Sequence, residues 1–296
     1  MIFAHLLLYL LLFCLSCDNQ AEKRYASCIN DMNALGYDLS RPDKIINLPS
    51  VLYEISGITL SDPASVACVQ DEHGVIFIVD IVKKEIKKQI TFHWEGDYED
   101  IARVDSVIFV LRSDGVLFEI RNYESSHFDK KIHALSSLGP DAESLCYDKH
   151  YNRLLITPKS KSGHNPGNEN IHPVYGFDLK TGKLIESPVL GIDLRAIKKF
   201  AAERSIRSSE RNGKIKFKPS ALGIHPVTDR LYVLSGIERM LFVFDRQGII
   251  ENIVKLDPEI FNMPEGISFF DNGDMLISNE GRQNPPTILI FNHTPI

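Results

Sequence analysis

Three glutamates of this chain recur at the same place in a repeated sequence pattern. Glu99, Glu143 and Glu265 each precede a small or polar residue, which Ile or Leu then follows. In two further copies of the pattern, Ser56 and Ser220 stand where the carboxylate would be. Carboxylates gathered in one place can coordinate a hard cation such as calcium, or can exchange protons with a substrate.

The spacing of the five copies indicates the fold that positions these residues. The aligned residues are separated by 43, 44, 77 and 45 residues. Three intervals share one period, and an insertion between the third and fourth copies explains the longer interval. A period of about 40–45 residues is typical of four-stranded propeller blades. The sequence therefore predicts an all-β fold, a five-bladed β-propeller of four-stranded blades.

Each copy reads as a short strand, a tight polar turn and a second, apolar strand with polar residues at its end. In an antiparallel pair, the start of the first strand lies beside the end of the second. The opening and closing residues should therefore meet on one face near the propeller axis. Besides the three glutamates, we expect this axial face to include Ser56, Asp71, Glu72, Arg112, Lys159, Ser220, Asn279 and Glu280.

Three carboxylates at one mouth repel one another, and calcium would relieve the repulsion because it accepts six to eight oxygen ligands in flexible geometry. The predicted calcium ligands are Glu99, Glu143 and Glu265. The alternative is a site without metal, in which the glutamates accept backbone N–H groups or pair with Arg112 and Lys159. His164 and His172, in an inserted loop, are expected to be solvated rather than to bind metal.

The N-terminus predicts export. Residues 1–17 form an apolar run that is short for a membrane span and ends in Leu15-Ser16-Cys17. This ending resembles a bacterial lipoprotein signal, in which Cys17 would carry the lipid. Plain secretion and a retained anchor are the alternatives. Each of them places the domain outside the cytoplasm, and the first predicts a lipid-anchored protein of the bacterial cell envelope, in the periplasm or outer membrane.

Domain boundaries follow from composition. Residues 18–42 form a polar leader, and residues 43–296 form the propeller. The last segment leaves room for three strands only, so a strand near residues 43–49 should complete the final blade. A helical insertion is expected at about 192–212, where Asp193 can cap an amphipathic helix. This basic segment reads as a solvated lid, or as a dock for an anionic ligand.

Charge and cysteine usage exclude some functions. The formal net charge of −6 and the pI of about 5.9 argue against nucleic acid and anionic membrane as partners, because the long-range field has the wrong sign. Cys68 and Cys146 lie in apolar strands and are expected to be small buried residues rather than disulfide partners. The sequence contains no nucleophile elbow, HExxH motif or phosphate-binding glycine loop.

These features together resemble the SdiA-regulated family of bacterial envelope proteins. The similarity rests on the Glu-Gly-Ile-like openings, on Gln70-Asp71-Glu72-His73, on Gly96-Asp97-Tyr98-Glu99 and on the exported N-terminus, and it covers about residues 45–292. It implies a five-bladed propeller with bound calcium and a distant likeness to NHL-repeat proteins, several of which bind partner proteins. It implies no biochemical activity.

The sequence thus favours a lipid-anchored, monomeric calcium-binding propeller that recognises a protein, a glycan or a small anionic molecule without turnover. A calcium-dependent hydrolase, acting as an esterase, lactonase or phosphodiesterase with an axial glutamate as base, is the alternative. A purely structural scaffold is the third possibility.

Overall fold

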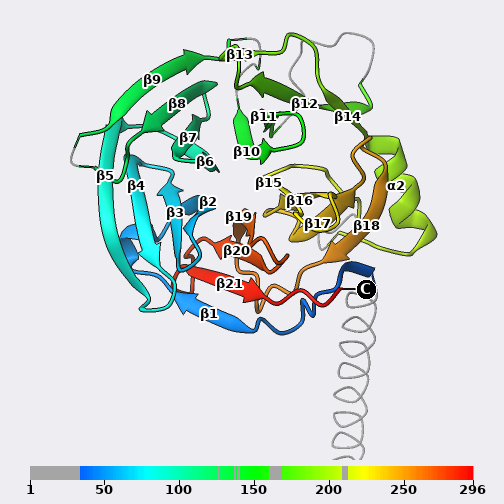
Figure 1. Cartoon of the computed structure of the whole chain (residues 1–296). Helices are drawn as coiled ribbons and strands as arrows, with labels where there is room; N and C mark the ends of the chain where they lie inside the picture. Colours follow the sequence, from blue (N-terminus) through cyan, green and yellow to red (C-terminus); the bar gives the residue numbers. More distant parts are fainter. Residues whose placement is uncertain are drawn as a thin grey trace, which may run out of the picture.

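The computed structural model confirms the five-bladed β-propeller (Figure 1). It describes residues 34–125, 127–136, 138, 141–159, 169–208 and 213–295. Blade 1 contains β2 (Ile55–Asp62), β3 (Ser65–Gln70), β4 (His73–Asp80) and β5 (Glu85–Glu95), and blade 2 contains β6 (Tyr98–Val104), β7 (Val107–Arg112), β8 (Val116–Arg121) and β9 (Asp129–Ala134). Blade 4 contains β15 (Ala221–Ile224), β16 (Leu231–Ser235), β17 (Met240–Phe244) and β18 (Ile250–Lys255).

Blade 5 closes the ring with a strand from the N-terminal part of the chain, as the sequence predicted. It contains β19 (Pro264–Phe269), β20 (Met275–Asn279) and β21 (Thr287–Phe291), and β1 (Lys44–Asn47) pairs antiparallel with β21. The short helix η1 (Ser50–Leu52) then leads from β1 into blade 1. This closure removes the sheet edge that a three-stranded final blade would expose.

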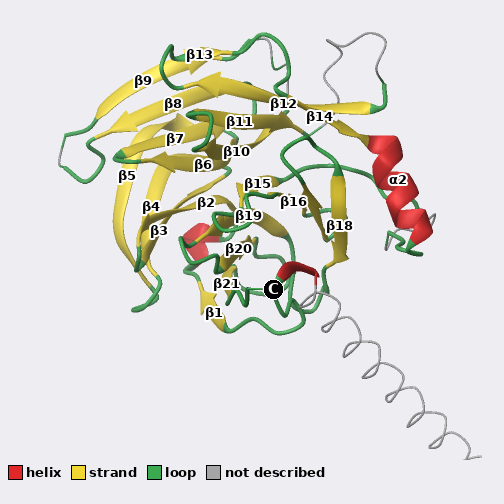
Figure 2. Ribbon diagram, turned by 45° about the vertical axis from the view of Figure 1, so that its right-hand side comes forward, coloured by secondary structure: helices red, strands yellow, loops and turns green. Residues whose placement is uncertain are grey.

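Burial explains why the inner strands are continuously apolar. All six residues of β3 are buried, because neighbouring blades cover both faces of the sheet. In the outermost strand β5, exposed residues alternate with less exposed ones along much of its length, because one face meets water. The innermost strands β2, β6, β10, β15 and β19 surround the propeller axis (Figures 1 and 2).

Blade 3 carries the insertions. It contains β10 (Ala142–Asp148), β11 (Arg153–Pro158), β12 (Ile171–Asp178) and the short β13 (Lys183–Leu184), and β14 (Leu190–Asp193) also pairs with β12. Helix α2 (Leu194–Glu203) follows, and the Asp193 carboxylate caps it by accepting from the Arg195 N–H. The helix ends at Glu203, earlier than the predicted boundary near residue 212. Ile197 and Ala201 bury its apolar face on blade 4.

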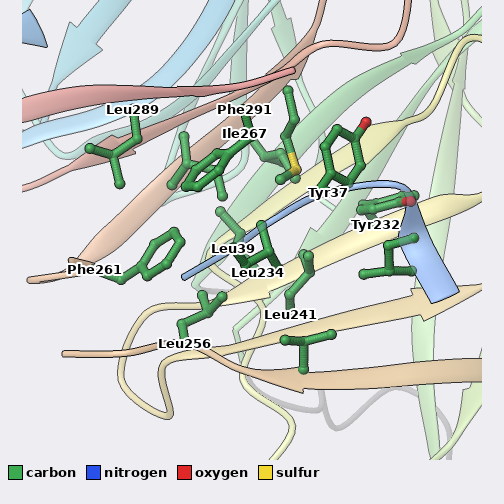
Figure 3. Close-up of a cluster of buried hydrophobic side chains, with 14 of the residues drawn as sticks. Tyr37, Leu39, Tyr232, Leu234, Leu241, Leu256, Phe261, Ile267, Leu289 and Phe291 are labelled. Carbon is green, nitrogen blue, oxygen red and sulfur yellow. The ribbon is translucent and has the colours of Figure 1, made fainter. Parts of the chain in front are cut away.

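Part of the expected polar leader belongs to the core. Leu35, Tyr37 and Leu39 are at most 3% exposed and pack against blades 4 and 5. Figure 3 shows Tyr37 and Leu39 within this cluster. The packed domain therefore begins by Leu35, before the boundary at residue 43 that composition suggested. Composition hid this segment because only alternate residues in it are large and apolar.

Other expectations about the chain ends and cysteines can be placed only in part. Cys68 and Cys146 are buried free thiols, as predicted. Cys17 and the export signal of residues 1–17 lie outside the described residues. In the described ranges, no helix is long and apolar enough to cross a membrane.

Candidate functional site

Each of the three repeated glutamates lies at a β-bulge at the start of an innermost strand. In β6, Tyr98 pairs with Arg112 and Asp100 pairs with Leu111, so Glu99 between them has no partner across the sheet. Glu143 in β10 and Glu265 in β19 lie at the same register shift. Bulges redirect the side chain of the extra residue and are common at rims and functional sites.

A lysine lies among these glutamates. The Lys159 Nζ is 2.6 Å from the Glu143 Oε1, and the charges of Glu99 and Glu265 also act on it. Burial would lower the pKa of the Lys159 ammonium, but its bond to Glu143 and these charges raise the pKa overall. We call this end of the axis, with the three glutamates and Lys159, the carboxylate mouth.

The glutamates of the mouth do not ionise as ordinary surface carboxylates do. Burial, with the charges of Glu143 and Asp97, raises the pKa of Glu99 to about 10. Burial, with the charges of Glu280 and Glu143, raises the pKa of Glu265 to about 8. Burial also raises the pKa of Glu143, although Lys159 opposes the rise. At neutral pH, Glu99 and Glu265 therefore hold protons, and Lys159 balances Glu143.

A second group of carboxylates adjoins the mouth. Burial raises the pKa of Asp71 to about 6, and the charges of Glu54 and Glu280 add to the rise. Glu280 pairs with Arg282 at 3.3 Å between Oε2 and Nε, yet burial raises its pKa too. The Asp71 Oδ1 is buried without a hydrogen-bond partner. Carboxyl groups therefore outnumber basic groups across this face.

The two serines of the repeat support the mouth instead of lining it with charge. The Ser220 Oγ donates to the Pro264 carbonyl at 3.2 Å and accepts from the Gly236 N–H at 3.1 Å. Its hydrogen bond to Glu265 lowers the pKa of that carboxyl, although burial outweighs it. The Ser56 carbonyl accepts from the Ser278 Oγ at 3.0 Å. These contacts hold blades 4, 5 and 1 together around the axis.

Three residues expected at the axial face have partners other than the three glutamates and Lys159. Arg112 forms a bidentate pair with Asp114, at 2.9 and 2.8 Å, rather than pairing with a glutamate of the mouth. The exposed Glu72 carboxylate lies 3.7 Å from the His73 Nδ1. The Asn279 amide donates to the Thr287 Oγ1 at 3.1 Å.

The inserted loop also departs from expectation. His172 is 1% exposed on β12, where its Nε2 lies 2.9 Å from both the Thr157 Oγ1 and the Pro158 carbonyl. The prediction that it is solvated was wrong, because β12 begins at Ile171 and takes the end of this loop into blade 3. His164 lies outside the described residues.

Sequence reasoning missed several acidic residues of this face. Glu54, Asp97 and Asp141 each lie two places before an aligned mouth residue, and each raises the pKa of a carboxyl at the mouth or beside it. The same repeat alignment could have found them. Glu238, in the turn after β16, is 2% exposed, and neither of its carboxylate oxygens has a hydrogen-bond partner. Glu238 does not occupy one of the aligned positions of the repeat, so the repeat alignment could not have found it.

The described mouth does not fit a calcium ion as it stands. Among residues 34–295 as far as they are described, no group of three His, Cys, Asp or Glu side chains could hold a metal ion. The Lys159 ammonium already contacts Glu143, which was a predicted ligand. The arrangement matches the alternative in which these glutamates pair with a lysine, and calcium remains a prediction from the sequence.

Two hollows lie away from the mouth. A cavity of about 660 Å³ opens at the opposite end of the axis, and all five innermost strands line it. Another, of about 490 Å³, lies beside α2, and Lys198, Arg207 and Lys214 line it together with apolar residues. The basic insertion thus contributes to a hollow, and its docking of an anionic ligand stays a prediction.

Comparison with known proteins supports the fold alone. No family model and no curated protein matches the sequence. Among solved structures, Myxococcus xanthus glutaminyl cyclase is similar with a TM-score of 0.60 and 11% identity, over 86% of this chain and 97% of the cyclase. A streptogramin B lyase has a TM-score of 0.49 and 12% identity, over 85% of this chain and 97% of the lyase. Staphylococcus aureus virginiamycin B lyase has a TM-score of 0.44 and 13% identity, over 86% of this chain and 75% of the lyase. The similarity to the glutaminyl cyclase concerns the fold alone.

Proposed function

We propose that this chain is a binding module whose carboxylate mouth recognises a ligand with a positively charged amine. The observation that carries the proposal is the excess of carboxylates over cations at the mouth and beside it. The carboxyls are those of Glu99, Glu143, Glu265, Asp71 and Glu280. The charges that act on these five carboxyls include two cations among the described residues, Lys159 and Arg282. An incoming cation lets the buried carboxyls release their protons and gain a charge partner.

Unpartnered acceptor atoms on the same face support a ligand that donates hydrogen bonds. The Asp71 Oδ1, the Asn279 Oδ1 and both Glu238 carboxylate oxygens are buried with no hydrogen-bond partner. All three residues lie at or just after the end of a second strand, so the blade topology brings them to the mouth side. A buried acceptor without a donor is costly, and an ammonium supplies three donors. This charge balance favours a cationic ligand over the small anionic one considered from the sequence.

Calcium is the competing cation. The donor chemistry of the mouth suits it, but calcium would have to displace Lys159 from Glu143. The SdiA-regulated resemblance, the lipid anchor at Cys17 and the location in the bacterial cell envelope belong to the proposal as well. They rest on sequence features, and Cys17→Ser should release the folded domain from the membrane fraction.

The binding test compares two molecules of similar size. Calorimetric titration of the full chain with 1,5-diaminopentane should give binding, whereas uncharged 1,5-pentanediol should give none. Glu143→Gln should weaken the diamine at least about tenfold, or about 1.4 kcal/mol. Glu85→Gln, an exposed carboxylate on the outer strand β5, is the matched control and should change nothing.

Several outcomes would contradict the proposal. Equal binding of diamine and diol, or unchanged diamine binding in Glu143→Gln, would contradict the proposal that the mouth binds a cationic ligand. In parallel, calcium chloride is compared with a chelator. A higher melting temperature with calcium, lost in Glu99→Gln and Glu265→Gln, would make calcium the cation that the mouth binds, and identical melting curves would exclude the calcium prediction.

A hydrolase is the second candidate, because the pKa of Glu265, at about 8, lies near operating pH, where a general acid or base works best. Glutaminyl cyclase shares the fold at 11% identity, which does not extend to its chemistry. Ester, lactone and phosphodiester substrates should be screened with and without calcium. If the wild type turns over one of these substrates and Glu265→Gln abolishes the turnover in a protein that remains folded, the chain is a hydrolase rather than a binding module.

A further inference from the structure

The cavity at the far end of the axis has a regular construction that the mouth does not explain. Counting from each aligned mouth residue, the second residue along the strand is Ile or Leu in every blade, and all five are at most 4% exposed. They are Ile58, Ile101, Leu145, Leu222 and Ile267. This aliphatic ring forms the floor of the cavity. It lies between the cavity and the carboxylate mouth.

The next residue of every innermost strand is small. The ring consists of Thr59, Ala102, Cys146, Gly223 and Ser268, and all five line the cavity. Larger side chains at this level would occupy the space that these five small residues leave open. The cavity of about 660 Å³ is therefore a consequence of five separate sequence choices. Its size lies in the range of about 300–1,000 Å³ typical of small-molecule sites.

Negative charge dominates the open end. Asp62, Asp105, Asp271 and Asp274 line the cavity together with a single basic residue, Arg103. Lys87 lies 3.7 Å from Asp62, and Asp274 accepts from the His293 N–H, whereas Asp105 and Asp271 are exposed. The charge balance inside the rim is thus four carboxylates against one guanidinium. An apolar floor beneath an acidic rim matches a molecule with an apolar body and a cationic end.

We propose that this cavity, which we call the axial funnel, binds a small cationic amphiphile, with its apolar body on the aliphatic floor and its ammonium at the aspartate rim. The site is separate from the carboxylate mouth, and its occupancy does not depend on the function proposed there. Burial of the apolar body supplies affinity, and the rim supplies the preference for a positive charge.

The test uses three probes with the same eight-carbon chain: octylammonium chloride, octan-1-ol and sodium octanoate, each below its micelle concentration. Calorimetry on the full chain should show octylammonium binding at least tenfold more tightly than octanoate, with octanol between them. Ser268→Leu should weaken octylammonium at least tenfold by filling the funnel. The double variant Asp105→Asn, Asp271→Asn should reduce the ratio of octylammonium affinity to octanoate affinity. Asn is chosen because it tolerates the positive φ of 52° at position 105.

Glu143→Gln separates the two ends of the axis. It should remove any octylammonium binding at the carboxylate mouth, where Glu143 lies, and leave octylammonium binding at the funnel, because Glu143 does not line the cavity. If Glu143→Gln abolishes the binding while Ser268→Leu does not, the amphiphile binds at the mouth and the funnel proposal is wrong. Equal binding of octylammonium and octanoate would also overturn it.

A labelling experiment covers the case in which the filled variant fails to fold. The Cys146 thiol lines the funnel, whereas Cys68 is fully buried in blade 1 away from it. Octylammonium should slow modification of Cys146 by methyl methanethiosulfonate, followed peptide by peptide with mass spectrometry, and leave Cys68 unchanged. Equal rates at Cys146 with and without octylammonium would contradict the proposal.

Discussion

The two ends of the propeller axis use the same five strands for opposite purposes. At the carboxylate mouth, Glu99, Glu143 and Glu265 lie around one lysine, and burial together with their mutual repulsion raises the pKa of these carboxyls. At the axial funnel, small side chains leave a hollow with an apolar floor and exposed acidic rim. At the mouth, the ionisation of each carboxyl depends on its neighbours, whereas the funnel is an open volume whose lining residues can change one at a time. The two ends should therefore respond differently to substitution.

The boundary between the two ends should be the least tolerant position. A Cβ at Gly57 would lie 2.6 Å from the Asp100 Cα, where blades 1 and 2 meet one residue above the mouth. Backbone cannot move aside as a side chain can, so Gly57→Ala should destabilise the fold by about 3 kcal/mol.

Gly96→Ala is the matched control for this prediction. Its added Cβ would approach the Arg112 Cδ at 3.0 Å and the Tyr98 ring at 3.3 Å, which are side-chain rather than backbone atoms, and the Arg112 side chain can shift. Denaturant unfolding measures both variants. Equal stability of the two would show that blades 1 and 2 are not packed as closely as described.

The mouth should lose stability when its cation is removed. Lys159→Met leaves Glu143 without its partner and raises the pKa of all three glutamates further. We expect a loss of about 1–3 kcal/mol at pH 8, less than for a fully buried pair because the Lys159 side chain is 42% exposed. The loss should shrink at pH 5, where the glutamates take up protons.

Exposed Lys199 on α2 provides the control, and Lys199→Met should change stability little at either pH. Thermal melts at the two pH values measure the effect. A loss in Lys159→Met that is the same at pH 5 and pH 8 would mean that the glutamates are ionised at both and that the mouth is not coupled as described.

The funnel should tolerate the addition of volume. Ser268→Leu adds apolar atoms to a hollow that is already present, and no hydrogen bond of the Ser268 hydroxyl to a described residue is lost. The free energy of unfolding should change by no more than about 1 kcal/mol, less than for Lys159→Met. A loss of several kcal/mol would show that the space is too tight for a ligand.

The repeat spacing was enough to predict the blades, and the incomplete last blade predicted the closing strand β1. The helix after Asp193 followed from its cap and its apolar periodicity. The repeat spacing also placed Glu99, Glu143 and Glu265 on one face. It could not show that Lys159 would contact Glu143 and that Arg112 would turn to Asp114, because such contacts depend on side-chain direction at bulges. The small residues of the funnel were visible in the alignment, but their meaning depends on the distance across the axis.

The pH dependence of stability follows from buried groups whose pKa values differ between the folded and unfolded states. Glu99 and Glu265 have raised pKa values in the folded state, so their contribution is fully present below the unfolded value of about 4.5 and is lost as pH rises through about 8 and 10. The buried His225, which directly follows β15 in blade 4, has the opposite sign, because burial lowers its pKa to about 4. Its contribution is present above about 6.5 and is lost as pH falls toward 4.

The most direct test is a carbon-13 NMR titration of the glutamate side-chain carboxyls, with Glu99→Gln and Glu265→Gln to assign two of the signals. The protonated, lysine-centred mouth predicts that the Glu265 signal moves near pH 8 and that the Glu99 signal moves at still higher pH. The reference for comparison is glutamate in an unstructured peptide, which titrates at about 4.3. If the signals of Glu99 and Glu265 both finish titrating below pH 6, the carboxylates of the mouth are ionised at neutral pH and the account of the site is wrong.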